Sequence, residues 1–167
     1  MEREVFLVGR VEEGAMKDIG QKILGFYNDN PSKEITLYIT SDGGNPNLAI
    51  AFYDFIKIKN VFLVTVALGE CNSSALTVLL AGHRRECTKN TLFLEHQLTR
   101  SYDKGASFNP LEMMALAENM KKLAESLRRI MVKETGQSIE AVKDQENKEL
   151  IMTAEEAKEF GLIHEII

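Results

Sequence analysis

Strand-like and helix-like segments alternate through the first half of the chain. Short apolar runs rich in β-branched residues begin near positions 5, 35 and 61, and the segments between them repeat their apolar residues at helical spacing. Strands that are separated by helices pair in parallel through right-handed crossovers. The alternation therefore predicts an α/β fold. Because the 167 residues contain no repeat and no Gly- or Pro-rich linker, we expect a single domain over residues 1–167.

The remaining elements are expected from the same patterns. A polar stretch at 83–90 precedes a strand, and a polar loop or arm at 97–110 precedes a long helix with an apolar stripe that ends at Gly136. The expected strands cover residues 5–9, 35–40, 61–66, 91–96 and 161–167. The expected helices cover residues 14–28, 47–57, 73–81, 111–135 and 154–160, with a further short helix starting at 138.

The segment from 66 to 82 is the candidate for chemistry. A break at 69–72 follows an apolar strand, and Ser73 and Ser74 open an apolar helix that stops at Gly82. A hydroxyl at the positive end of a helix suits a nucleophile whose reaction forms an oxyanion. Alternatively, Ser73 or Ser74 only caps the helix, because serine is a favoured N-cap. The segment alone favours the cap.

Composition excludes several classes of function. A net charge of −5 without a basic block argues against nucleic acid as a partner. No apolar run approaches the roughly 20 residues that span a bilayer, and no secretory signal opens the chain, so we expect a cytoplasmic protein that does not enter the membrane. The two cysteines, Cys71 and Cys87, are expected to be reduced thiols. The three histidines, His83, His96 and His164, are scattered along the sequence. Neither a metal nor a cofactor is therefore expected.

Five stretches, in order, resemble the proteolytic subunit of the Clp protease (ClpP), within the ClpP/crotonase fold. Residues 37–44 resemble the family's L-Y-I-N-S-P-G-G turn, and 49–54 resemble its next helix, G-x-x-I-Y-D. Residues 69–75 stand where the family has G-x-A-A-S-M-G, and 95–97 where it has I-H-Q-P. The segment from Thr135 to Ile163 matches its C-terminal signature. The resemblance extends from about Val5 to Ile167 and implies repeated β-β-α units, a largely parallel sheet and a long helix in the C-terminal half.

The resemblance also implies a catalytic set. Ser73 falls on the nucleophile, His96 on the general base and Glu149 on the triad acid, while the amides of Gly44 and Ser74 fall on the oxyanion hole. Amide hydrolysis by a serine needs these roles, and glutamate serves as the acid in some hydrolases. The alternatives are a structurally hydrogen-bonded His96, a solvated Glu149 and an ordinary Gly-Gly turn.

Departures from the family pattern surround this set. Asp42 replaces proline in the turn and adds negative charge near the oxyanion; the others are Asn72, Ser74, Glu95 and Leu98. The first expectation is a ClpP-type serine endopeptidase that acts on peptides or unfolded proteins. The alternative is a catalytically weak or inactive ClpP-like structural or regulatory subunit. A crotonase-like acyl-CoA enzyme comes third, because the serine and the His-Gln pair favour hydrolysis.

The resemblance further implies a homo-oligomer, either a heptameric ring or a stacked pair of rings. The contact between rings would use the arm at 97–110, which carries Arg100, Asp103 and Lys104, and the long helix after it. Lys148 replaces the arginine that bridges the rings, so the ring is better supported than the double ring. An ATPase unfoldase partner has less support, because the chain enters its first strand where the family carries an N-terminal extension.

Overall fold

The computed structural model describes residues 2–102 and 104–167, so Asp103 of the arm lies outside the described residues. Its strands are β1 (Glu4–Val8), β2 (Ile35–Ser41), β3 (Leu63–Asn72), β4 (Arg84–Cys87), β5 (Leu92–Leu94), β6 (Ile151–Met152) and β7 (Glu165–Ile166). Its helices are α1 (Glu13–Asp29), α2 (Pro46–Lys59), α3 (Ser74–Leu79), α4 (Pro110–Thr135), α5 (Ile139–Lys148) and α6 (Ala154–Phe160).

The strands form one mixed sheet that is largely parallel. Along the path β1-β2-β3-β4-β7 every neighbouring pair is parallel. Strand β5 pairs with β3 in parallel and with β6 in antiparallel orientation. The expected α/β fold with a mostly parallel sheet is therefore confirmed.

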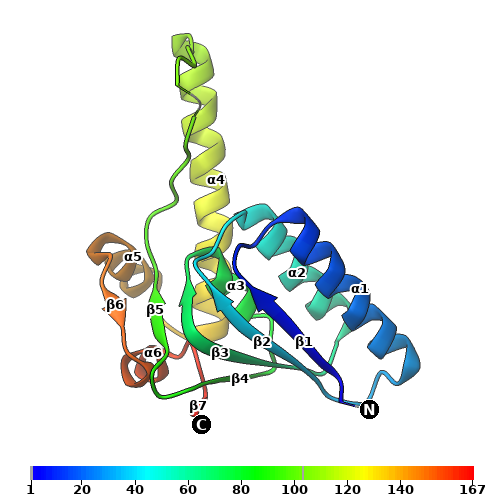
Figure 1. Cartoon of the computed structure of the whole chain (residues 1–167). Helices are drawn as coiled ribbons and strands as arrows, with labels where there is room; N and C mark the ends of the chain where they lie inside the picture. Colours follow the sequence, from blue (N-terminus) through cyan, green and yellow to red (C-terminus); the bar gives the residue numbers. More distant parts are fainter. Residues whose placement is uncertain (1, 103) are drawn as a thin grey trace.

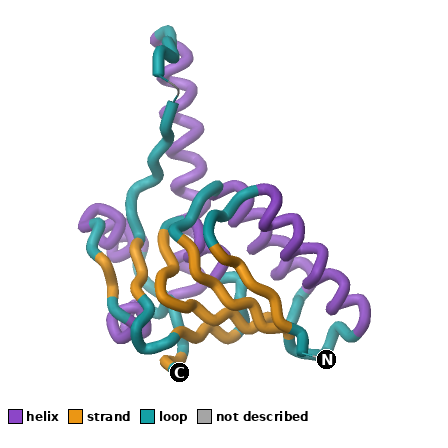
Figure 2. The backbone as a smooth tube through the Cα atoms, viewed as in Figure 1, coloured by secondary structure: helices purple, strands orange, loops and turns teal. Residues whose placement is uncertain are grey.

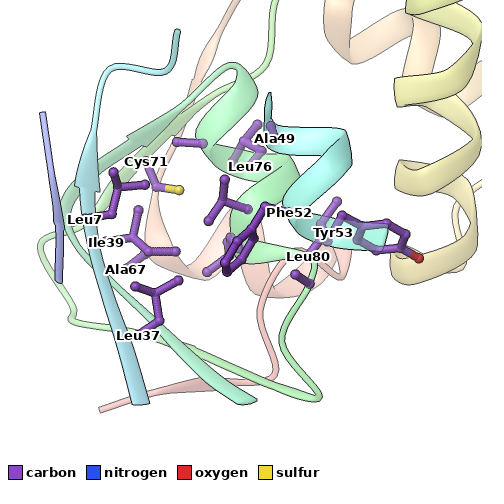
Figure 3. Packing of buried hydrophobic residues seen from close by; sticks show 14 of the residues in the cluster. Leu7, Leu37, Ile39, Ala49, Phe52, Tyr53, Ala67, Cys71, Leu76 and Leu80 are labelled. Atoms are coloured by element: carbon purple, nitrogen blue, oxygen red, sulfur yellow. The ribbon is translucent and has the colours of Figure 1, made fainter. Parts of the chain in front are cut away.

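The core lies between the sheet and the helices packed on it. Helices α1 and α2 run along one side of the sheet (Figure 1, Figure 2). Strands β1 and β2 alternate buried and more exposed positions, as expected for strands with one face against the core. Figure 3 shows buried side chains of strands and helices pointing toward one another: Leu7, Leu37, Ile39, Ala67 and Cys71 from the sheet, and Ala49, Phe52, Leu76 and Leu80 from the helical side.

Two expectations for the middle of the chain are wrong. Strand β3 does not break at 69–72 but continues to Asn72. A bulge between Ala67 and Cys71 shifts its register, and beyond it β3 pairs with β5 instead of β4. The polar stretch at 83–90 contains β4, whose Arg85 is buried. Its guanidinium donates to the carbonyl oxygens of Leu162 at 2.8 Å and Glu134 at 2.9 Å, so the strand accommodates a charged residue facing inward.

The expected strands at 91–96 and 161–167 form only shorter pieces, β5 and β7. The long helix is confirmed as α4, which Asn109 and Glu112 cap reciprocally. The first half of α4 and the arm before it stand away from the rest of the fold (Figure 1). Within the described residues, none of the helices combines the length and the apolar character that crossing a membrane requires.

Candidate active site

Ser73 lies on a tight turn between β3 and α3. Its φ of 55° and ψ of −128° are uncommon for a residue with a side chain and cost on the order of 1–3 kcal/mol. Backbone hydrogen bonds hold the turn on both sides: the Ser73 amide donates to the Leu94 carbonyl of β5 at 2.7 Å, and the Leu76 amide donates to the Ser73 carbonyl at 2.9 Å. The sheet and the helix together therefore impose this conformation on Ser73.

Neither serine hydroxyl caps α3. Ser73 is the N-cap residue by position, but its side chain accepts no capping hydrogen bond. The Ser74 hydroxyl is buried and has no hydrogen-bond partner among the described residues. Capping therefore does not account for this pair of serines.

The Gly43–Gly44 turn packs directly against Ser73. Both glycines have positive φ, 97° and 150°. A Cβ atom on Gly43 would lie 2.8 Å from the Ser73 Cβ, and one on Gly44 would lie 2.4 Å from the Val11 carbonyl oxygen. Only glycine fits at these two positions, because a side chain on Gly43 would clash with Ser73 and one on Gly44 would clash with the backbone of Val11.

Two backbone amides near the Ser73 turn have no acceptor among the described residues. The residues on either side of Gly44 both bond to Val11: the Val11 amide donates to the Gly43 carbonyl, and the Asn45 amide donates to the Val11 carbonyl. The amide of Gly44 itself has no described acceptor. The Ser74 amide belongs to the first turn of α3, where amides have no acceptor within the helix. Such amides can donate to a negatively charged oxygen that forms next to Ser73.

A cavity of about 440 Å³ brings most of the predicted site residues together. Gly44, Ser73, Ser74 and His96 all line it. The His96 Nδ1 atom lies 2.7 Å from the carbonyl oxygen of Gln97. Among the described residues, no hydrogen bond joins the imidazole to the Ser73 hydroxyl. The structure thus gathers four of the five predicted residues, with His96 held by its own neighbour.

Glu149 is not part of this lining. It is exposed, has a left-handed φ of 50° and ends α5. The acid that α5 contributes to the cavity is instead Glu146, one turn earlier and buried. Arg128 binds it with Nε at 2.8 and 3.0 Å from its two oxygens and with Nη2 at 2.7 Å. Glu146 stands four residues after the apolar Val142 and therefore lies on the same face of α5. This spacing is the sequence signal that could have placed Glu146 on the buried face.

Glu95 adds a second carboxyl group to this side of the cavity. Burial, and then the nearby Glu146 carboxylate, raise the pKa of Glu95 to about 8, against the opposing effect of Arg128. One guanidinium therefore faces two carboxyl groups, and Glu95 carries its proton at neutral pH. Within the described residues, no group of three or more His, Cys, Asp or Glu side chains is arranged to hold a metal ion.

The raised pKa of Glu95 predicts a pH-dependent stability. The folded protein holds this proton up to about pH 8, whereas an unfolded chain releases it near 4.5. Stability is therefore highest below the unfolded pKa and falls as the pH rises toward 8. Glu95→Gln mimics the neutral carboxyl group and should remove this fall. We expect it to gain about 2 kcal/mol over wild type between pH 5 and pH 8 in urea unfolding, less than the full pKa difference because Glu95 is only partly buried. A gain that is the same at both pH values would contradict a raised pKa at Glu95.

Comparison with known protein families covers the chain from end to end. The family described as Clp protease matches residues 1–167. This agrees with the site, where a serine at positive φ meets a Gly-Gly turn and a histidine at one cavity. Because the match leaves no part of the chain uncovered, the protein belongs to the Clp protease family, whose chains are in general serine peptidases.

Proposed function

We propose that this protein is a ClpP-type serine endopeptidase with Ser73 as its nucleophile. The observation that carries the proposal is the position of Ser73, which is held at positive φ next to the Gly-Gly turn, while the amides of Gly44 and Ser74 have no acceptor among the described residues. His96 lines the same cavity. The proposed substrates are peptides or unfolded proteins, whose extended backbone can enter the cavity.

The proposed reaction follows from these positions. The Ser73 hydroxyl oxygen attacks the scissile carbonyl carbon, and His96 Nε2 takes the proton. The Gln97 carbonyl accepts a hydrogen bond from Nδ1, which leaves Nε2 free to act as the base. The oxyanion binds the amides of Gly44 and Ser74. The C–N bond then breaks, His96 returns the proton to the leaving amine, and water hydrolyses the acyl-enzyme.

Glu149 is the proposed orienting acid, and the register of β5 and β6 supports a position for it opposite His96. In the antiparallel ladder of β5 and β6, Leu94 lies opposite Ile151. Two more residues of the same register would place His96 opposite Glu149, with both side chains on one face and their Cβ atoms about 5 Å apart. The ladder ends before this point in the isolated chain. We propose that it extends in the assembled or substrate-bound protein, where the Glu149 carboxylate replaces the Gln97 carbonyl as the acceptor for His96 Nδ1.

A catalytically weak or inactive subunit is the second candidate. It is favoured by the exposed position of Glu149 outside the cavity and by the absence of a described hydrogen bond between Ser73 and His96. On this reading the protein hydrolyses nothing alone, and mixing it with an active paralogue restores activity in a joint assembly.

A fluorophosphonate probe separates the two candidates. The Ser73 oxygen should bond to phosphorus with release of fluoride, while His96 takes the proton. We expect mass spectrometry to find the label on Ser73 of the wild-type protein and to find none in the Ser73→Ala variant. The control variant Ser32→Ala, in an exposed loop, should be labelled as the wild type is. A wild-type protein that stays inert where other serine hydrolases react would favour the second candidate.

Glu149→Gln tests the extended ladder in the same assay. Loss of an orienting carboxylate lowers the reactivity of a triad by up to about 10⁴-fold, and we expect a fall of at least about tenfold here. If Glu149→Gln reacts at the wild-type rate, the Gln97 carbonyl alone orients His96, and Glu149 has no role in the reaction.

We further propose a homo-oligomer, a heptameric ring or a stacked pair of rings. The projecting part of α4 (Figure 1) carries apolar side chains that none of the described residues covers, with Leu111 77%, Met113 60% and Met114 69% exposed. Exposed patches of this kind usually mark an interface. Lys148 is engaged by Asp144 of its own helix at 2.6 Å, which does not favour a role in bridging two rings.

Light scattering on a sizing column tests the assembly. Seven copies of the 18.8 kDa chain give about 130 kDa and fourteen give about 260 kDa. We expect one of these masses, and Met114→Glu should convert a stacked pair to single rings by placing charge in the apolar contact. A stable monomer at micromolar concentration would contradict the chambered arrangement.

A further inference from the structure

An ion pair lies at the edge of the cavity, next to the Gly-Gly turn. Arg10 Nη1 donates to Asp42 Oδ2 at 3.0 Å, and both side chains line the cavity together with Gly44 and Ser73. Arg10 belongs to the link between β1 and α1, and Asp42 directly follows β2. The pair thus connects this link to the turn that carries the proposed oxyanion donor.

The backbone around Arg10 is held against the turn. The amide of Gly9 donates to the Thr40 carbonyl at 3.0 Å, and that of Val11 donates to the Gly43 carbonyl at 2.8 Å. The Asn45 amide in turn donates to the Val11 carbonyl at 2.8 Å. Exposed ion pairs usually contribute little to stability, partly because both side chains lose freedom. Here hydrogen bonds already fix the backbone on both sides of Arg10. The guanidinium is therefore held close to the Asp42 carboxylate, and forming the pair costs less conformational entropy.

The charge of Asp42 explains why a partner is needed. Its carboxylate lies two residues before Gly44, whose amide has no described acceptor. A free carboxylate there would oppose negative charge that develops beside Ser73. The other cations of the cavity are engaged elsewhere, since Arg128 binds Glu146 and the guanidinium of Arg100 lies 5.7 Å from the ring centre of Tyr102.

We propose that Arg10 is a positioning residue of the active site. It neutralises the Asp42 carboxylate beside the oxyanion donor, and this charge effect governs the reaction rate. It also adds a contact between the Asp42–Gly44 turn and the β1–α1 link, but the backbone hydrogen bonds already hold the turn in place, so loss of this contact alone does not slow the reaction. The inference rests on the proposed function, because it assigns the Gly44 amide to the oxyanion. A rigid residue at position 42 would restrict the conformation of the turn directly. In this chain the ion pair restricts the turn in part by charge attraction instead.

Two variants that break the same ion pair separate charge from contact. Arg10→Ala leaves a free carboxylate, whereas Asp42→Asn leaves a free cation. We expect Arg10→Ala to react about three- to tenfold more slowly with the fluorophosphonate probe, as one uncompensated exposed charge would produce, and expect Asp42→Asn to be no slower than wild type. The double variant Arg10→Ala/Asp42→Asn should recover most of the rate. Salt should narrow the deficit of Arg10→Ala.

Arg84→Ala is the matched control. Arg84 is also an exposed arginine in ion pairs, with Glu34 and Glu86, but lies outside the cavity lining, and its loss should leave the labelling rate unchanged. Arg10→Lys, which keeps the charge, should retain most of the rate. Equal losses in Arg10→Ala and Asp42→Asn, or an unchanged rate in Arg10→Ala, would overturn the inference.

Hydrogen–deuterium exchange gives a readout that does not depend on reactivity. Because both single variants remove this contact with the turn, the peptide covering residues 40–46 should exchange faster in each of them than in wild type, with no change in Arg84→Ala. A wild-type protein that does not react with the probe contradicts the proposed function but leaves this measurement intact. Unchanged exchange of this peptide in both single variants would overturn the inference by itself.

Discussion

The parallel pairing of β2 and β3 is the constraint on which the rest of the site depends. The two strands run in register from Ile35 opposite Leu63 to Ile39 opposite Ala67, and a bulge then brings Ser41 opposite Cys71. Parallel strands deliver their carboxyl ends to one edge of a sheet, so the Gly-Gly turn after β2 and the Ser73 turn after β3 meet there. The bulge adjusts the length of β3, and the close contact of Gly43 with Ser73 completes the arrangement.

Much of this fold follows from local patterns. The apolar periods of α1, α2 and α4 and the β-branched runs of β1 and β2 identify the elements, because each buries one face against the same core. The strand β4 does not show this pattern. Its inward Arg85 is satisfied by carbonyl groups from α4 and the C-terminal segment, and these partners are adjacent only after folding. A local pattern contains no signal for such distant partners.

The same distinction applies to the site. Ser73, Ser74, Gly44 and His96 were predicted through the family resemblance of the motifs that carry them, and the sheet brings these motifs together at one cavity. The contribution of Arg10 could not be predicted, because it depends on how the β1–α1 link packs against the cavity. Glu146 was missed, although its i, i+4 spacing from Val142 places it on the buried face of α5. The position of Glu149 depends on where the pairing of the two-residue strand β6 with β5 ends. A sequence pattern does not indicate the end of so short a strand.

We propose that the Ser73 turn holds an oxyanion with the backbone amides of Gly44 and Ser74. A crystal structure of the protein with a phosphonate bonded to Ser73 tests it most directly. We expect the phosphonyl oxygen to lie within about 3 Å of the amide nitrogens of both Gly44 and Ser74, with His96 Nε2 facing the oxygen that links Ser73 to phosphorus. A phosphonyl oxygen that points into solvent, with either amide turned away, would contradict it.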